Sequence, residues 1–144
     1  MPDNPRDGVL LGFDYGLRRI GVAVGQKLTG TATPLATLAA RDGAPDWDAL
    51  ARLVAEWKPA AFVVGVPYNM DDSRQAMTDR AERFLRQLHG RFNLPVHAVD
   101  ERLSSSEAGD RLRSARQQGR RGRIAKPDVD SAAACVLLET WLNS

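Results

Sequence analysis

The chain of 144 residues has the length of one domain, and its 43% hydrophobic and 26% charged residues are typical of a globular protein. No apolar run approaches the roughly 20 residues that cross a bilayer, and the polar start "MPDNPRDG" lacks the pattern of a secretory signal. We therefore expect a cytoplasmic protein without membrane contact, with a flexible tail over residues 1–7 and a single domain over residues 8–144. One cysteine excludes an internal disulfide, and the two histidines lack partners at zinc-site spacing.

The formal net charge of +2 conceals a strongly basic segment. Residues 102–126 hold eight basic residues and two acidic ones, so the rest of the chain is net negative. This distribution predicts a polyanionic partner, because cations set against phosphates release condensed counterions. A solvated loop is the alternative.

The first half of the chain predicts three antiparallel strands and then a helix. Short apolar runs at 8–16 and 19–25 are joined by a glycine-containing turn, which is typical of a β-hairpin. The segment "GTATPLATL" follows as a strand near an edge, because Pro34 cannot donate to a ladder. From Asp46 apolar residues recur at helical spacing until Pro59, and the run "AAFVVGVP" then predicts a central strand covered on both faces.

The second half predicts alternating helices and strands. Ser73 is expected to cap a helix that closes near His89 and Gly90, and "LPVHAVDE" forms the last strand. The segment "SSSEAGDRLRSA" predicts a helix and "RQQGRRGRIAKP" a basic loop. A final helix turns five apolar residues inward: Val129, Ala133, Val136, Leu137 and Trp141. The order indicates an α/β fold, a five-stranded mixed sheet with its first three strands antiparallel and helices on both faces.

Acidic side chains stand at the ends of three predicted elements. Asp14 follows the first strand, Glu101 follows the last strand, and Asp130 lies in the first turn of the last helix. Each alone has an ordinary explanation, in a turn, on the surface or, together with Asp128, at a helix cap. Carboxylates that converge repel one another unless cations neutralise them, so the trio indicates Mg²⁺ or Mn²⁺. Two such ions activate water and stabilise the leaving oxygen of a phosphodiester without a nucleophilic side chain.

Four segments then resemble the signature blocks of one family. "DYGLRRIGVAV", "VVGVPYNMDDS", "DERLSSSEA" and "DSAAACVLLETWL" are similar, in order and spacing over residues 8–142, to those of the YqgF family of RNase H-like nucleases. The resemblance implies an RNase H-like fold and metal-dependent hydrolysis of nucleic acid. It also implies that Asp14, Glu101 and Asp130 are the catalytic, metal-binding acids. Asp72 departs from the family, which usually has Gly there, so the loop over the site is expected to differ.

Basic residues near these acids are candidates for phosphate contacts. Arg18 and Arg19 follow Asp14 in the hairpin, with a solvated turn as the alternative, and Arg102 directly follows Glu101. Tyr15 and Tyr68 are either framework residues or platforms on which a base stacks. The basic segment would hold a strand backbone through charge, with little sequence information, by its residues Arg111, Arg116, Arg120, Arg121, Arg123 and Lys126.

The family resemblance leaves the substrate open. Its members are described either as Holliday junction resolvase-like or as pre-16S rRNA processing nucleases. We expect 5′-end processing of pre-16S rRNA by a monomer or weak homodimer, with cleavage of four-way DNA junctions as the alternative. A resolvase cuts two strands symmetrically and should be a two-fold dimer. A non-catalytic nucleic-acid-binding module is the alternative of another class, whereas an actin-like or sugar-kinase ATPase would require two such domains.

Overall fold

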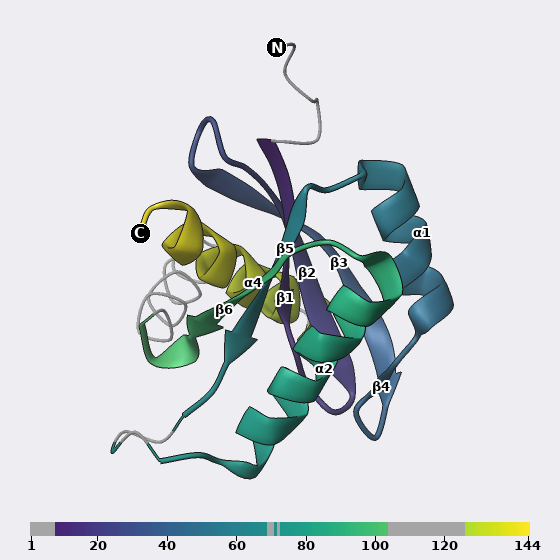
Figure 1. Ribbon diagram of the computed structural model, residues 1–144, viewed down its shortest axis with the longest axis vertical. Coiled ribbons are helices and arrows are strands. Elements are labelled where there is room, and N and C mark those ends of the chain that lie inside the picture. Colours follow the sequence, from purple (N-terminus) through teal and green to yellow (C-terminus); the bar gives the residue numbers. More distant parts are fainter. Residues whose placement is uncertain (1–7, 69–70, 72, 104–125) are drawn as a thin grey trace.

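The computed structural model describes residues 8–68, 71, 73–103 and 126–144, which form a six-stranded sheet with helices on both faces (Figure 1). The strands are β1 (Val9–Asp14), β2 (Arg19–Gln26), β3 (Thr31–Arg41), β4 (Ala44–Pro45), β5 (Ala61–Val66) and β6 (Val96–Asp100). The helices are α1 (Trp47–Trp57), α2 (Ala76–Phe92) and α4 (Lys126–Leu142), with a short 3₁₀ helix η2 (Glu101–Leu103). The expected α/β class and mixed sheet are confirmed.

Strand β1 joins the antiparallel and parallel halves of the sheet, whose strand order is β4-β3-β2-β1-β5-β6. It pairs antiparallel with β2 and parallel with β5, which pairs parallel with β6. All residues of β5 are buried, as its continuous apolar run predicts. Because β1, β5 and β6 are parallel, their carboxyl ends share one edge of the sheet, the lower end in Figure 1.

Side chains of the sheet alternate between two hydrophobic clusters, one on each face. Helices α1 and α2 cover the cluster that contains Phe13 and Tyr15. Helix α4 covers the opposite cluster, which contains Leu10 and Val63. Successive residues of a strand point to opposite faces, so Asp14 lies on the α4 side of the sheet. The end of β1 therefore offers a carboxylate to one face and a tyrosine to the other.

Helix α4 lies close to the sheet because glycines stand beneath it. A β-carbon added at Gly21 would come within 2.0 Å of the carbonyl oxygen of Asp130, and one at Gly12 within 2.8 Å of a leucine in α4. β-carbons added at Gly25 and Gly65 would lie 2.7 and 2.6 Å from leucine side-chain atoms of the same helix. The glycines thus set the height of α4 above the sheet and, with it, the position of Asp130.

The sheet has six strands where the sequence predicts five. The additional strand, β4, is two residues long and pairs only with Ala40 and Arg41 at the end of β3. Two residues are too few to show a hydrophobic period, so this strand leaves no signal in the sequence. Most of β3 therefore forms an edge of the sheet, in agreement with the placement of Pro34.

The ends of helix α2 differ from those predicted. Ser73 does not cap it, because the Ser73 N–H and hydroxyl both donate to the Asp71 carboxylate, at 2.9 and 2.6 Å. The helix begins three residues later, where Gln75 and Thr78 form a capping box. At the other end it continues to a left-handed Asn93, past the predicted stop.

Helix α4 is more completely buried than the predicted stripe. Five consecutive residues, 134–138, are buried, whereas Val129, Ala133 and Trp141 are only partly covered. The predicted helix and basic loop of residues 104–125 lie outside the described residues, as does Asp72. Within the described part of the chain, no helix combines the length and hydrophobicity of a membrane span.

Candidate active site

Two of the predicted acids follow parallel strands at the same edge of the sheet. Asp14 is the last residue of β1, and Glu101 comes directly after β6. Strand β5 separates them, and its Gly65 leaves the space into which Glu101 turns, since a β-carbon there would lie 3.0 Å from a carboxylate oxygen of Glu101. Both carboxylates are thus held at strand ends, where α/β sheets bind their ligands.

The third acid reaches this edge from α4. Asp14 pairs with Gly21 across the β1–β2 ladder, and the backbone of Asp130 lies directly over Gly21. Opposed residues of neighbouring strands have Cα atoms only about 4.5–5.5 Å apart. The structure therefore brings Asp130 next to Asp14, although 116 residues separate the two in the sequence.

Burial and neighbouring negative charges raise the pKa values of two of these acids, Asp14 and Glu101. Burial, followed by the negative charges of Glu101 and Asp130, raises the pKa of Asp14 from its ordinary value to about 7. Burial raises the pKa of Glu101 as well, and the neighbouring charge of Asp100 adds to that effect. Two acids with raised pKa values at one edge are typical of a functional site and not of a surface turn.

Arg19 offsets part of this negative charge. Its Nε donates to Oδ2 of Asp130 at 2.9 Å, so the strand β2 and helix α4 are linked across the site. The pair shows that Arg19 lies beside the acids, on the same face of the sheet.

The donor set suits a hard divalent cation. Carboxylate oxygens are the ligands that Mg²⁺ and Mn²⁺ prefer, and a bound cation would offset the repulsion that helps to raise the pKa of Asp14. Among the described residues, no three acidic, histidine or cysteine side chains are already gathered around one point. One carboxylate oxygen of Asp130, Oδ2, is instead engaged by Arg19.

The other predicted phosphate contacts have different surroundings. Arg18 is exposed in the β1–β2 turn, where it is accessible to a ligand. Arg102 is bound by Asp100, with Nε 3.0 Å from both carboxylate oxygens, and its guanidinium lies 5.5 Å from the centre of the Tyr68 ring. Arg111, Arg116, Arg120, Arg121 and Arg123 lie outside the described residues, and Lys126 is the first residue of α4.

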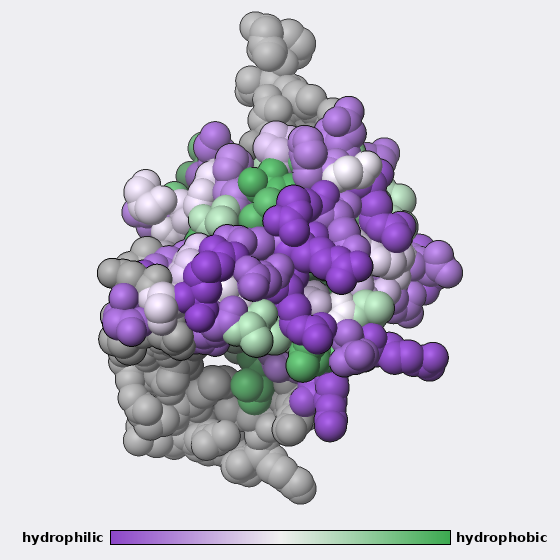
Figure 2. All heavy atoms as spheres, turned by 60° about the horizontal axis from the view of Figure 1, so that its bottom comes forward, coloured by the Kyte–Doolittle hydropathy of each residue, from purple (hydrophilic) through white to green (hydrophobic). Residues whose placement is uncertain are grey.

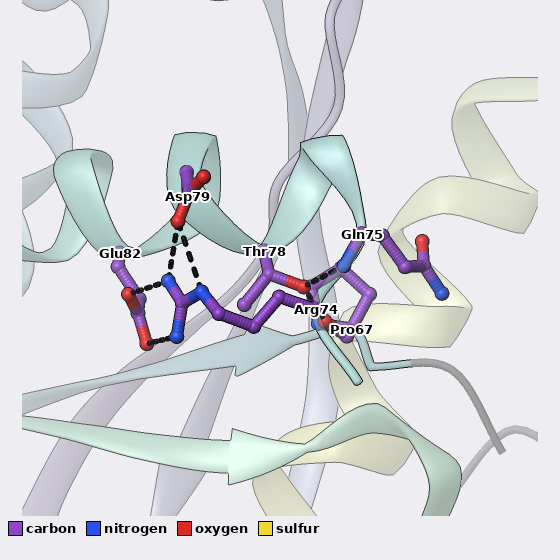
Figure 3. A network of polar contacts seen from close by, with 6 residues as sticks. All are labelled: Pro67, Arg74, Gln75, Thr78, Asp79 and Glu82. Carbon is purple, nitrogen blue, oxygen red and sulfur yellow. Dashed lines mark hydrogen bonds and ion pairs between the residues drawn. The ribbon is translucent and has the colours of Figure 1, made fainter. Parts of the chain in front are cut away.

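A polar network that sequence reasoning missed secures the segment between β5 and α2 (Figure 3). The fully buried hydroxyl of Thr78 donates to the carbonyl of Pro67 and accepts from the N–H of Gln75. Arg74 reaches past them to the carboxylates of two helix residues, Asp79 and Glu82. Arg74 precedes the helix, so none of these pairs has the i, i+4 spacing by which helical ion pairs are found in a sequence.

The arrangement of strands, helices and acids defines the protein class as RNase H-like. The solved structure of Thermus thermophilus RuvC in complex with a Holliday junction substrate has the same fold, with a TM-score of 0.55 over 95% of this chain and 97% of that chain, at 14% identity. The chain belongs to the RuvX family, described as Holliday junction resolvase, whose model matches residues 8–144. Membership makes it a hydrolase of nucleic acids and confirms the resemblance seen in the sequence.

Close relatives carry a different functional name. Proteins of Legionella pneumophila and Azotobacter vinelandii, both called "Putative pre-16S rRNA nuclease", are 53% and 56% identical to the chain. The matches cover 94% and 93% of this chain and 96% and 92% of the relatives. The chain is thus similar to these proteins over nearly their whole length.

Proposed function

We propose that the chain is a divalent-metal-dependent nuclease that hydrolyses phosphodiester bonds at the edge formed by Asp14, Glu101 and Asp130. The observation that carries this proposal is geometric: Asp14 and Glu101 follow parallel strands at one edge of the sheet, and the backbone of Asp130 lies over Gly21, the ladder partner of Asp14. Burial, and then the charges of the other two acids, raise the pKa of Asp14 in agreement with this arrangement. A protein gains nothing in stability by burying an acid among acids, so the arrangement indicates a cation that the carboxylates serve.

The three carboxylates would hold Mg²⁺ or Mn²⁺, in a site for two ions. The ions, when bound, supply an activated water and stabilise the leaving oxygen of the phosphodiester. Asp14 contributes a rigid ligand because the buried strand β1 fixes its backbone. Glu101 is placed by the end of β6, and Asp130 would bind the metal beside its contact with Arg19.

The substrate that we favour is the 5′ end of a pre-16S rRNA, processed in the cytoplasm during ribosome biogenesis. Support comes from the names of the relatives that share more than half of the aligned residues with this chain. Cleavage of four-way DNA junctions is the second candidate, favoured by the description of the family model and by the likeness of fold to RuvC. Junction cleavage requires a two-fold dimer, whereas RNA processing is compatible with a monomer or weak homodimer.

Cleavage assays with three labelled substrates test this proposal. A pre-16S RNA fragment, a four-way DNA junction and a linear duplex are incubated with Mg²⁺, Mn²⁺ or EDTA and either wild type or Asp14→Asn. Glu56→Gln is the matched control, because Glu56 is an exposed acid on α1, on the opposite face of the sheet. We expect wild type and the control to cut with metal only, and Asp14→Asn to lose cutting.

The outcomes separate the candidate functions. Preferred cutting of the RNA supports the processing nuclease, and paired symmetric cuts in the junction support the resolvase. If Asp14→Asn cuts as well as wild type, the proposed site is wrong. Binding of nucleic acid without cutting under any condition would instead favour a non-catalytic binding module.

A further inference from the structure

A cavity lies on the opposite face of the sheet from Asp14. It is a cavity of about 130 Å³ between the end of β1, the β3–β4 turn and helix α2. In Figure 2, which brings the lower edge of Figure 1 forward, hydrophilic side chains cover most of the surface that is coloured by hydropathy. The residues that form the cavity include Tyr15, Asp42, Gly43, Trp47, Arg80 and Arg83.

Tyr15 contacts both helix α2 and the β3–β4 turn, which both line this cavity. The ring is buried and stacks on Phe84 of α2, with ring centres 5.0 Å apart. Its hydroxyl donates to the carbonyl of Gly43 at 2.5 Å. Arg80 packs against the same turn, with its guanidinium 3.5 Å from the carbonyl of Asp42. Of the two interpretations of Tyr15, these contacts support a framework residue, which links the β3–β4 turn to α2.

The cavity carries an excess of positive charge. Arg80 and Arg83 are three residues apart on α2 and so share one face of the helix. Asp42 is the one acid among the residues that line the cavity. Arg83 is exposed, and it forms no hydrogen bond or ion pair with any other residue that the structure describes. Arg74 differs, since two carboxylates already occupy its guanidinium.

The shape of the cavity suits an oxyanion better than a base. Trp47 is the larger aromatic residue in its wall, but that ring already packs against Phe84, with ring centres 5.9 Å apart, and against Arg91, whose guanidinium carbon lies 4.0 Å from the ring centre. A nucleobase would need an open ring face for stacking. A tetrahedral oxyanion needs only hydrogen-bond donors, which the guanidinium groups of Arg80 and Arg83 in the cavity wall provide.

We propose that this Arg80–Arg83 pocket binds a backbone phosphate of the nucleic-acid substrate, away from the phosphodiester that is cut. The inference rests on the proposed function, because it assumes that the nucleic acid crosses the edge of the sheet where Asp14 lies. Tyr15 is the residue after Asp14 and points to the other face of the sheet. A nucleic-acid backbone that continues from the acids across the end of β1 therefore meets the pocket next. The pocket gives affinity and register and carries no sequence information.

Binding in EDTA tests the pocket independently of cleavage. A fluorescein-labelled RNA hairpin is titrated with wild type, Arg83→Gln and the control Arg86→Gln, an exposed arginine of α2 outside the pocket. We expect Arg83→Gln to weaken binding roughly tenfold and to lower the slope of log K against log salt by about 0.7–0.9, because one phosphate is no longer neutralised. Arg86→Gln should leave both close to wild type. Equal effects of the two variants would overturn the proposal.

A scan with single methylphosphonates, which remove the charge of one phosphate, locates the contact. At one position the substitution should weaken wild type as much as Arg83→Gln does, with no further loss when both changes are combined. Additive losses at every position would contradict the pocket. If inorganic phosphate raises the melting temperature of wild type but not of Arg83→Gln, and the scan finds no position at which the two losses coincide, the pocket serves the free anion and the proposal for the nucleic-acid backbone is wrong.

The failures of the two proposals are distinguishable. If Asp14→Asn loses cleavage while Arg83→Gln binds like wild type, only the pocket is refuted. If Arg83→Gln shows the expected loss of binding while Asp14→Asn still cuts, only the metal site is refuted. A wild type that binds no RNA and no junction would overturn both.

Discussion

Gly21 lies directly beneath Asp130, and a β-carbon at position 21 would reach to 2.0 Å from the Asp130 carbonyl oxygen. Because Gly21 also pairs with Asp14, this one glycine sets the spacing between two of the three acids. The site therefore depends on a residue that has no side chain and takes no part in chemistry.

Replacement of this glycine should damage both stability and activity. We expect Gly21→Ala to cost at least about 1–3 kcal/mol in the free energy of unfolding, because α4 must move away from the sheet. Urea denaturation measures the loss, and the cleavage assay measures the displaced Asp130. Gly90→Ala is the control, since Gly90 is helical with open space around it and the change should stabilise by about 0.5–1 kcal/mol. A Gly21→Ala protein as stable as wild type would show that α4 does not rest on this residue.

The raised pKa of Asp14 has a consequence for stability as a function of pH. Without metal, the folded protein holds this proton up to about pH 7, whereas the unfolded chain releases it near pH 4. The folded state therefore binds more protons between these values, so the free energy of unfolding falls as pH rises through that window. For Asp14 alone the fall is on the order of 4 kcal/mol at most.

Asp14→Asn should remove most of this dependence. Urea unfolding in EDTA, at about pH 4.5 and about pH 8, compares the two proteins, and the variant should be the more stable at the higher pH. A smaller slope remains because the pKa of Glu101 is also raised. Parallel stability profiles for wild type and variant would mean that Asp14 is not buried among other charges.

The Thr78 hydroxyl should matter more to stability than its short side chain suggests. Thr78→Val keeps the shape but leaves the Pro67 carbonyl and the Gln75 N–H without this partner, at a cost of about 1–3 kcal/mol. Thr33→Val, on the exposed surface of β3, serves as the control and should change stability by less than about 0.5 kcal/mol. Thermal denaturation distinguishes the two, and equal melting temperatures would contradict a structural role for the network.

The basic segment, residues 102–126, is predicted to bind the nucleic-acid backbone through its charge. Replacing Arg120, Arg121 and Arg123 by Gln should weaken the binding of RNA. The slope of log K against log salt should also fall by about 0.7–0.9 for each phosphate that these arginines neutralise in the wild type. Titrations at several salt concentrations measure the slope. An unchanged slope would mean that the segment is a solvated loop that does not touch the substrate.

The sequence is informative about strands and about the acids at their ends. Apolar runs such as β5 indicate burial on both faces, and an acid that ends such a run stands out, which is why the positions of Asp14 and Glu101 at strand ends are predictable. Contacts that the backbone makes, and close approaches that depend on a glycine, leave no such pattern in the sequence. The approach of α4 to Gly21, the two-residue β4 and the ion pair between Arg19 and Asp130 depend on how distant segments meet, and spacing along the chain does not encode that.

The polar groups around α2 escape prediction for a related reason. Ser73 matches a capping signal, but a nearer carboxylate, Asp71, competes for it. Arg80 and Arg83 look like ordinary solvated residues of an amphipathic helix until the β3–β4 turn is seen against them.

Titration of Mn²⁺ into the metal-free protein, followed by electron paramagnetic resonance, tests the central claim most directly. Wild type and Glu56→Gln should bind up to two ions per chain, and Asp14→Asn and Glu101→Gln should each lose most of that binding. Bound metal should also raise the melting temperature of wild type but not of Asp14→Asn. Equal Mn²⁺ binding by wild type and both acid variants would contradict the account.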